Sequence, residues 1–126
     1  IVLQPTSPLK LSKDIDSAIS IFKRKKADSV SSFCEAKPKD WYFNLNKDGS
    51  LKQSVKKNIK NNKKNKSTYL LNGAIFICKT NFVKKGFGFT RKCFAYLMPK
   101  SRSVDIDVID DFKYAEYLIS RNNKKL

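Results

Sequence analysis

The segment Arg102-Ser103-Val104-Asp105-Ile106-Asp107 decides how the rest of the chain is interpreted. If it is extended, successive side chains point to opposite faces, so Asp105 and Asp107 share one face while Val104 and Ile106 are buried on the other. Two carboxylates at one place repel each other unless one takes up a proton or a cation lies between them. Mg²⁺ suits such a pair, because it prefers oxygen ligands and is usually held by one or two carboxylates together with substrate phosphates. Two other interpretations stay open: a solvated strand end, or Asp107 as the cap of a following helix.

The composition indicates a single folded domain, or part of one, in a chain of 126 residues. The longest apolar runs, such as residues 73–78, are far too short to cross a bilayer, and no signal peptide is visible. The three cysteines form no Cys-x-x-Cys spacing and histidine is absent, which excludes zinc-finger sites and histidine-based catalysis. These features predict a cytoplasmic protein without a membrane partner.

The net charge of +16 is unevenly distributed along the chain. No acidic residue lies between Asp48 and Asp105, whereas the same span contains 14 lysines and arginines. An anionic partner is therefore expected, and nucleic acid, a nucleoside triphosphate and an acidic sugar all fit this charge. The alternative is that most of these lysines only decorate surface positions exposed to solvent.

The N-terminal apolar run, residues 1–3, predicts a strand covered on both faces. The prolines that follow it end the strand and enforce a rigid turn. This turn leaves Gln4, Thr6 and Ser7 as hydrogen-bonding groups at the carboxyl end of the strand, which is where open α/β sheets place their ligands.

A helix and a second strand follow this turn. Ser12 is predicted to be the helix N-cap, and apolar residues recur at helical spacing from residue 15 to residue 22. Residues 29–34 predict the next buried strand. The order strand, helix, strand implies a parallel crossover, so we expect an α/β fold with a mostly parallel, doubly wound sheet and flanking helices.

The middle of the chain is more varied. Residues 41–45 predict a short aromatic strand, and residues 46–49 a turn. Residues 51–67 are rich in lysine and asparagine and predict a surface loop. Residues 69–77 predict another buried strand, in which the small Gly73 would let a ligand or another backbone approach closely.

The remaining segments are an aromatic, basic stretch and a final helix. Residues 82–98 predict an excursion from the sheet, a hairpin that buries Phe87, Phe89 and Phe94 against another subunit. In the final helix, Asp107 is predicted as the N-cap, with Asp110 completing a capping box. The apolar stripe of this helix is predicted to be Phe112, Ala115, Leu118 and Ile119.

Residues 85–89 resemble the first half of the RNA-recognition-motif signature, whose aromatic residues stack on bases. Thr90 and Lys92, however, occupy the valine and final aromatic positions of that signature. Too few residues separate it from its candidate partner strand, residues 75–77, to contain the required helix and further strand. Nucleic acid is therefore not the expected partner.

Three motifs in the same order resemble the acylneuraminate cytidylyltransferases, the family of CMP-sialic acid synthetases. The motifs are residues 4–9 (Gln-Pro-Thr-Ser-Pro-Leu), residues 72–77 (Asn-Gly-Ala-Ile-Phe-Ile), and Met98-Pro99 followed by residues 102–107. This resemblance spans the whole chain. It implies a Rossmann-like nucleotidyltransferase fold and an enzyme that transfers CMP from CTP to a nonulosonic acid, releases pyrophosphate and requires Mg²⁺. A homodimer is expected through the excursion over residues 82–98.

The resemblance also implies roles for particular residues. Asp105 and Asp107 are implied as the metal ligands, and Asp107 also as the residue that helps to activate the attacking hydroxyl. The residues implied in substrate binding are Gln4, Thr6, Lys39, Asn72 and Phe76. Phe76 stands where family members often have Tyr, and Lys39 matches by approximate position only.

Several departures from the family pattern leave other functions open. The usual Arg-Gln pair and proline upstream of the Asn-Gly motif are absent from residues 61–66, and Ser101 replaces the usual Glu. The Gly- and Lys-containing loop that grips the triphosphate in the family would precede Ile1, so this segment is not expected to turn over CTP alone. A degenerate homologue without activity and a basic RNA-binding module remain the alternatives, and the motifs do not select one nonulosonic acid.

Overall fold

The structure, a computed structural model, describes residues 1–54, 67–83 and 92–123. The chain divides into two units. The first comprises Ile1–Cys34 together with Leu71–Leu126, and the second is Glu35–Leu70. Most of the predicted site residues, including both aspartates of the acidic segment, belong to the first unit.

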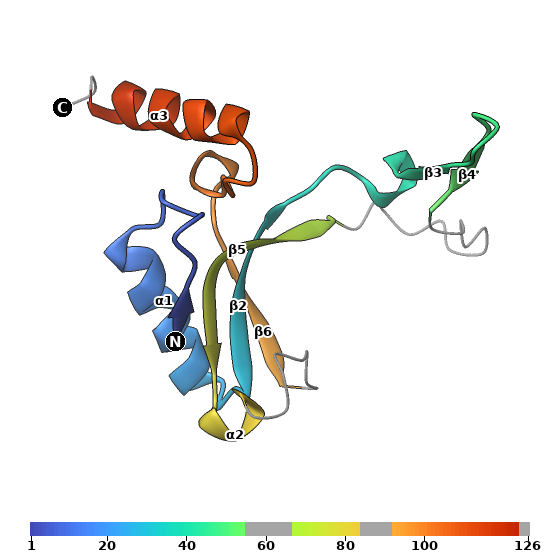
Figure 1. Cartoon of the computed structure of the whole chain (residues 1–126). Helices are drawn as coiled ribbons and strands as arrows, with labels where there is room; N and C mark the ends of the chain where they lie inside the picture. The colour runs from blue at the N-terminus through green and yellow to red at the C-terminus, as the bar shows by residue number, and fades with distance from the viewer. Residues whose placement is uncertain (55–66, 84–91, 124–126) are drawn as a thin grey trace. The chain divides into compact units, whose positions relative to one another are not determined.

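A four-stranded sheet forms the centre of the first unit (Figure 1). Its strands, in spatial order, are β1 (Val2–Leu3), β5 (Tyr69–Cys78), β2 (Ser29–Glu35) and β6 (Cys93–Leu97). β1 and β5 are antiparallel, whereas β2 and β6 are parallel. Ala74 and Ile75 of β5 are fully buried, so the core lies against the middle of this strand.

The α/β class is confirmed, but the expectation of a mostly parallel sheet is wrong for the described strands. The sheet is mixed, because β5 runs antiparallel to its neighbours on both sides. Its C-terminal end lies beside the start of β2, where the Lys79 N–H donates to the Asp28 carbonyl at 3.0 Å. The connection from β1 to β2 therefore passes over β5. An apolar run predicts a strand but carries no information about its direction. The expectation that residues 1–3 are covered on both faces is wrong as well, because Val2 and Leu3 of β1 are 44% and 40% exposed.

Helix α1 (Ser12–Arg24) packs on this core through the predicted apolar positions. Ala18 is fully buried, and the side chains around it are Ile15, Ile19 and Phe22. The start of the helix differs from the prediction, because Leu11 rather than Ser12 holds the N-cap position. The Asp14 carboxylate accepts the Leu11 N–H at 2.8 Å, which satisfies one of the donors that a helix start leaves unpaired.

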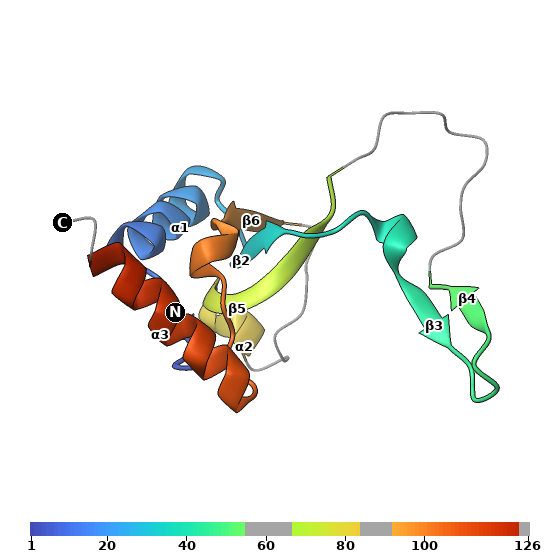
Figure 2. The ribbon, with the colours of Figure 1, turned by 90° about the horizontal axis from the view of Figure 1, so that it is seen from above.

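Helix α3 (Ile109–Asn123) is the last element of the chain (Figure 2). It buries only part of its predicted apolar stripe. Ala115 and Leu118 are buried in a small second core with Leu9 and Val104. The prediction is wrong for the other two members of the stripe, Phe112 and Ile119, which are 47% and 44% exposed. No helix in the described ranges is long and apolar enough to reach across a bilayer.

The cap of α3 is also not the one predicted. The Asp111 carboxylate accepts the backbone N–H groups of Asp107 and Val108, at 3.0 and 3.1 Å. Asp110 is instead paired on the surface with Lys113. Asp111 therefore takes the capping function that the sequence predicted for Asp107 with Asp110, and the Asp107 side chain is not used to cap the helix.

The predicted excursion over residues 82–98 differs from the structure at its C-terminal end. Helix α2 (Thr80–Val83) follows β5, and Cys93–Leu97 is strand β6 of the main sheet. Phe94 is half-buried and packs against the main core of the first unit, and its burial against another subunit stays a prediction. Phe87 and Phe89 lie outside the described residues, and the homodimer stays a prediction.

The second unit contains a short hairpin. A 3₁₀ turn at Lys39–Trp41 precedes β3 (Phe43–Leu45), which pairs in antiparallel register with β4 (Leu51–Gln53). The predicted turn between them is confirmed, since the Gly49 N–H donates to the Asn46 carbonyl at 3.0 Å. The loop predicted for residues 51–67 therefore begins with a strand, and residues 55–66 lie outside the described part of the chain.

Candidate functional site

The acidic segment lies against the N-terminal proline turn. The Ile106 N–H donates to the Thr6 carbonyl at 2.8 Å, although these residues are far apart in sequence. Residues 103–107 are irregular and form no strand, which corrects the prediction. Asp105 is half-buried, whereas Asp107 is exposed at a bend. The structure thus brings Asp105 to the predicted polar turn and leaves the Asp107 side chain facing solvent.

Asp105, Gln4 and Ser7 gather around Gly73. The hydroxyl of the fully buried Ser7 lies 3.4 Å from Asp105 Oδ1 and can donate to it. Gly73 has a φ of +73°, and a Cβ added to it would lie 2.5 Å from Gln4 Oε1 and 3.2 Å from Asp105 Oδ2. The amide oxygen and the carboxylate therefore meet above a backbone position that has no side chain. Glycine provides both the required backbone angle and this space.

Lys10 fixes the turn that carries Gln4. Its ammonium group donates to the carbonyl oxygens of Gln4 and Ser7, at 2.7 and 2.8 Å. Burial lowers the pKa of Lys10, because the surrounding protein replaces part of the water that stabilises its charge. Lys10 was not predicted from the sequence, because a lysine after a proline turn has the same pattern as a solvated surface lysine.

Asn72 holds the neighbouring part of β5 in place. Its Nδ2 donates to Ser103 Oγ at 2.8 Å and to Met98 Sδ at 3.4 Å. Its Oδ1 accepts the Ser32 hydroxyl and, at 3.3 Å, the Ala74 N–H. The side chain is almost completely buried, and its amide donors and acceptor are all used within the protein. Its predicted contact with substrate stays a prediction, whereas its contacts in the structure link three segments of the chain.

Replacing Asn72 with Ala should lower the free energy of unfolding by about 2 to 3 kcal/mol, because the buried Ser32 hydroxyl and Ala74 N–H each lose a partner. Chemical denaturation measures this change. Asn44→Ala is the matched control, since within the described residues the Asn44 side chain accepts one exposed hydrogen bond, from Ser54. It should change stability by less than about 0.5 kcal/mol. Equal effects of the two substitutions would contradict the role assigned to Asn72.

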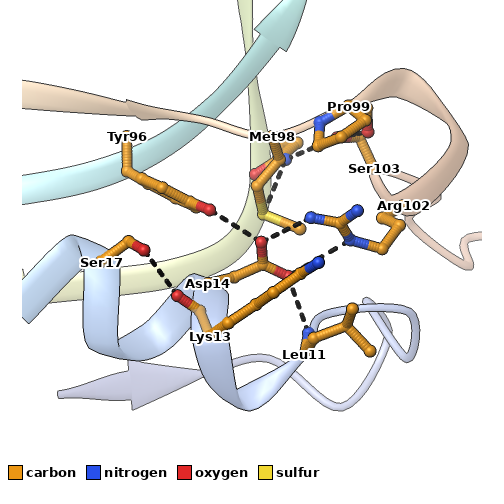
Figure 3. Close-up of polar contacts among 10 residues, drawn as sticks. Leu11, Lys13, Asp14, Ser17, Tyr96, Met98, Pro99, Arg102 and Ser103 are labelled. Carbon is orange, nitrogen blue, oxygen red and sulfur yellow. Dashed lines mark hydrogen bonds and ion pairs between the residues drawn. The ribbon is translucent and has the colours of Figure 1, made fainter.

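Asp14 forms a buried ion pair with Arg102 (Figure 3). Arg102 Nη2 lies 2.6 Å from Asp14 Oδ1, and Arg102 Nε lies 3.3 Å from Oδ2. The Tyr96 hydroxyl donates to Oδ1 at 2.7 Å. Burial of Asp14 by itself raises the pKa of the carboxyl, but the hydrogen bonds from Arg102, the Leu11 N–H and Tyr96 together lower the pKa below its ordinary value. Asp14 is therefore ionised in the folded protein.

The lowered pKa of Asp14 predicts loss of stability in acid. The ionised carboxylate stabilises the fold fully at pH values above its unfolded pKa of about 3.9, and this contribution disappears as the pH falls through the lower folded pKa. Asp14→Asn should cost about 3 kcal/mol at pH 7, because Arg102 loses its charged partner. Stability measured from pH 7 to pH 3 should fall less steeply in this variant than in the unmodified protein. If the free energy of unfolding fell equally steeply with pH in both proteins, the ionised Asp14 carboxylate would not be the source of the loss of stability in acid.

Three further residues were predicted to bind substrate, namely Thr6, Phe76 and Lys39. Thr6 is exposed, and its carbonyl oxygen is the acceptor for Ile106. Phe76 is half-buried and lies opposite Val2 in the pairing of β1 with β5. Lys39 is exposed and belongs to the second unit, whereas Asp105 belongs to the first, and its contact with substrate stays a prediction.

The donor atoms near Gly73 suit a hard cation. The Asp105 carboxylate and the Gln4 amide provide oxygen ligands, which Mg²⁺ prefers. Within the described residues, no group of three or more histidine, cysteine or carboxylate side chains is arranged to hold a metal. The Asp105 carboxylate and the Gln4 amide oxygen are thus of the chemical type that Mg²⁺ accepts, while Asp105 and Asp107 as its ligands stay a prediction.

Comparisons with known proteins point to one family name. The chain is 32% identical over 115 residues to the N-acylneuraminate cytidylyltransferase of Streptococcus agalactiae serotype III (strain NEM316), and 33% identical to that of serotype V (strain ATCC BAA-611 / 2603 V/R). The predicted family resemblance is confirmed. The similarity to these N-acylneuraminate cytidylyltransferases covers 89% of this chain but only 28% of each relative. No protein-family model matches the chain.

Proposed function

We propose that the protein containing this chain transfers CMP from CTP to a sialic-type nonulosonic acid. The observation that carries the proposal is the meeting of the Asp105 carboxylate with Gln4 at Gly73. It gains weight because the surrounding sequence resembles N-acylneuraminate cytidylyltransferases over 89% of the chain. Since the chain spans 28% of the length of these relatives, the activity belongs to the whole protein.

In the proposed reaction, the anomeric hydroxyl oxygen of the sugar attacks the α-phosphorus of CTP. The bond from this phosphorus to the oxygen that bridges to the β-phosphate breaks, and pyrophosphate leaves with the electron pair. Bound Mg²⁺ would supply electrostatic stabilisation of the charge that develops on the phosphate oxygens. Asp105 and Asp107 would hold this ion, and the Asp107 carboxylate is proposed to accept the proton of the attacking hydroxyl.

Gln4 and Thr6 are proposed to bind the sugar. Lys10 fixes the backbone carbonyl of Gln4, and the Gln4 side-chain amide lies on the same side of Gly73 as the Asp105 carboxylate before substrate binds. Phe76 is proposed to provide an apolar contact, Asn72 to shape the pocket, and Lys39 to meet the sugar carboxylate. The cytoplasm and a homodimer are proposed as the setting of the reaction.

The proposal is tested with the full-length protein that contains this chain. Incubation with CTP, Mg²⁺ and, in turn, N-acetylneuraminic, legionaminic and pseudaminic acid should give CMP-sugar and pyrophosphate in equal amounts with at least one acid. 3-Deoxy-octulosonic acid is the comparison substrate and should react more slowly. A folded protein that binds Mg²⁺ but forms no CMP-sugar with any of these acids would contradict the proposal and favour a degenerate homologue.

A further inference from the structure

The ion pair of Asp14 and Arg102 lies outside the set of residues proposed to touch substrate or metal. Asp14 is fully buried, and both of its oxygens accept hydrogen bonds from Arg102 (Figure 3). The edge of the guanidinium group formed by Nε and Nη2 is thus occupied by the protein itself. A role for this arginine must therefore be sought in what the ion pair holds in place.

The pair joins the start of α1 to the 3₁₀ turn at Lys100–Arg102. This turn is closed by hydrogen bonds from the Arg102 N–H to the Pro99 carbonyl at 3.0 Å and from the Ser103 N–H to the Lys100 carbonyl at 3.1 Å. Ser103 Oγ also donates to the Pro99 carbonyl at 2.9 Å. The turn is compact, so fixing Arg102 also fixes the direction in which the chain leaves it towards Asp105.

The same start of α1 holds the other side of the site. Lys10 lies four residues before Asp14 and fixes the carbonyl of Gln4 at 2.7 Å. Gln4 and Asp105 therefore approach each other from two segments, both tied to residues 10–14. A bidentate arginine–carboxylate contact suits this task, because its planar geometry restrains orientation as well as distance.

We infer that Asp14 and Arg102 are positioning residues, whose ion pair sets the place of the Asp105 carboxylate against the Gln4 turn. The part of this inference that concerns catalysis rests on the proposed function, whereas the part that concerns structure does not. The Ile106 amide can be used to measure this placement, because its N–H donates to the Thr6 carbonyl at 2.8 Å and so joins the two segments. Loss of the placement exposes this amide to hydrogen exchange.

The experiment compares amide exchange in the full-length protein and its Arg102→Gln variant. Exchange at Ile106 should rise about tenfold or more, while exchange at Ala27, whose N–H donates to Phe22 at the far end of α1, should stay within about twofold. Arg102→Lys keeps the charge without the two-pronged contact and should give a smaller rise in the same direction, which provides a second variant if Arg102→Gln does not fold. Lys79→Gln, which breaks the half-exposed ion pair with Asp28, is the matched control. It should leave the exchange rates of both the Ile106 and the Ala27 amides unchanged.

Unchanged exchange at Ile106, or an equal rise at Ile106 and Ala27, would overturn the inference, because the pair would then contribute only general stability. Activity separates it from the proposed function. Arg102→Gln should lower kcat about tenfold or more and raise the Mg²⁺ concentration needed for half-maximal rate, with little change in the KM for CTP. If Ile106 alone becomes exposed but the unmodified protein makes no CMP-sugar, the proposed function fails and the positioning role stands.

Discussion

Asp105→Asn should reduce CMP transfer by about 100- to 1000-fold, the range typical for the loss of one electrostatic contact that acts in the transition state. The substitution keeps the size of the side chain and its hydrogen bond from Ser7 but removes the negative charge. It should also raise the Mg²⁺ requirement, because an amide oxygen binds a hard cation more weakly than a carboxylate. Steady-state rates of the full-length protein, measured at several Mg²⁺ concentrations, provide the test.

Asp110→Asn is the matched control for this substitution. It makes the same change of charge in the same part of the chain, but the Asp110 side chain is 83% exposed and, among the described residues, pairs with Lys113 on the surface. Its rate should therefore stay within about twofold of the unmodified protein, as expected for a surface pair. Similar rates for the two variants would mean that Asp105 is not part of the reaction site.

Gly73→Ala should reduce activity by about 10- to 100-fold, with a smaller effect on stability. The added methyl group would lie 2.5 Å from Gln4 Oε1. Because this oxygen ends a flexible side chain, the amide can move away, and the displaced Gln4 would no longer meet Asp105. A displacement of about 1 Å is enough for a 100-fold loss of rate. The positive φ adds roughly 1 to 2 kcal/mol of backbone strain.

Gly49→Ala is the control that separates the effect of backbone strain from the effect of displacing the Gln4 side chain. Gly49 has a similar φ of +84°, but nothing lies within 4 Å of a Cβ added there. Both substitutions should lower the free energy of unfolding by similar amounts, and only Gly73→Ala should impair turnover and raise the KM for the sugar. Normal kinetics in Gly73→Ala would show that the space above Gly73 has no part in the reaction.

Local patterns in the sequence predicted the elements well where burial alone defines them. The apolar spacing that centres on Ala18 predicted α1, and the continuous apolar run around Ile75 predicted β5. The same patterns did not show that β5 is antiparallel, because direction depends on which strands become neighbours. They also did not separate the buried Leu118 from the exposed Ile119, since both lie on the apolar side of α3.

The resemblance predicted which segments lie close together, but not the residues that hold them in place. The proximity of the Gln4 turn to Asp105 was predicted from the resemblance and agrees with the contacts in the structure. Lys10 was not predicted, and Arg102 was recognised only as part of a motif, because a basic residue that binds carbonyls or a distant carboxylate has no local signature. The Asp14–Arg102 pair joins positions 88 residues apart, a relation that only the folded chain reveals.

Paramagnetic line broadening by Mn²⁺ tests most directly whether a divalent cation binds beside Asp105. Amide resonances of the full-length protein are recorded as Mn²⁺ is added in the presence of CTP. The resonances of Gly73 and Gln4 should broaden first, whereas that of Lys79, about 20 Å further along β5 at ~3.3 Å per residue, should persist to higher Mn²⁺ concentrations. Broadening of Lys79 before Gly73, or equal broadening in Asp105→Asn, would contradict a metal site formed by Asp105 at the Gln4 turn.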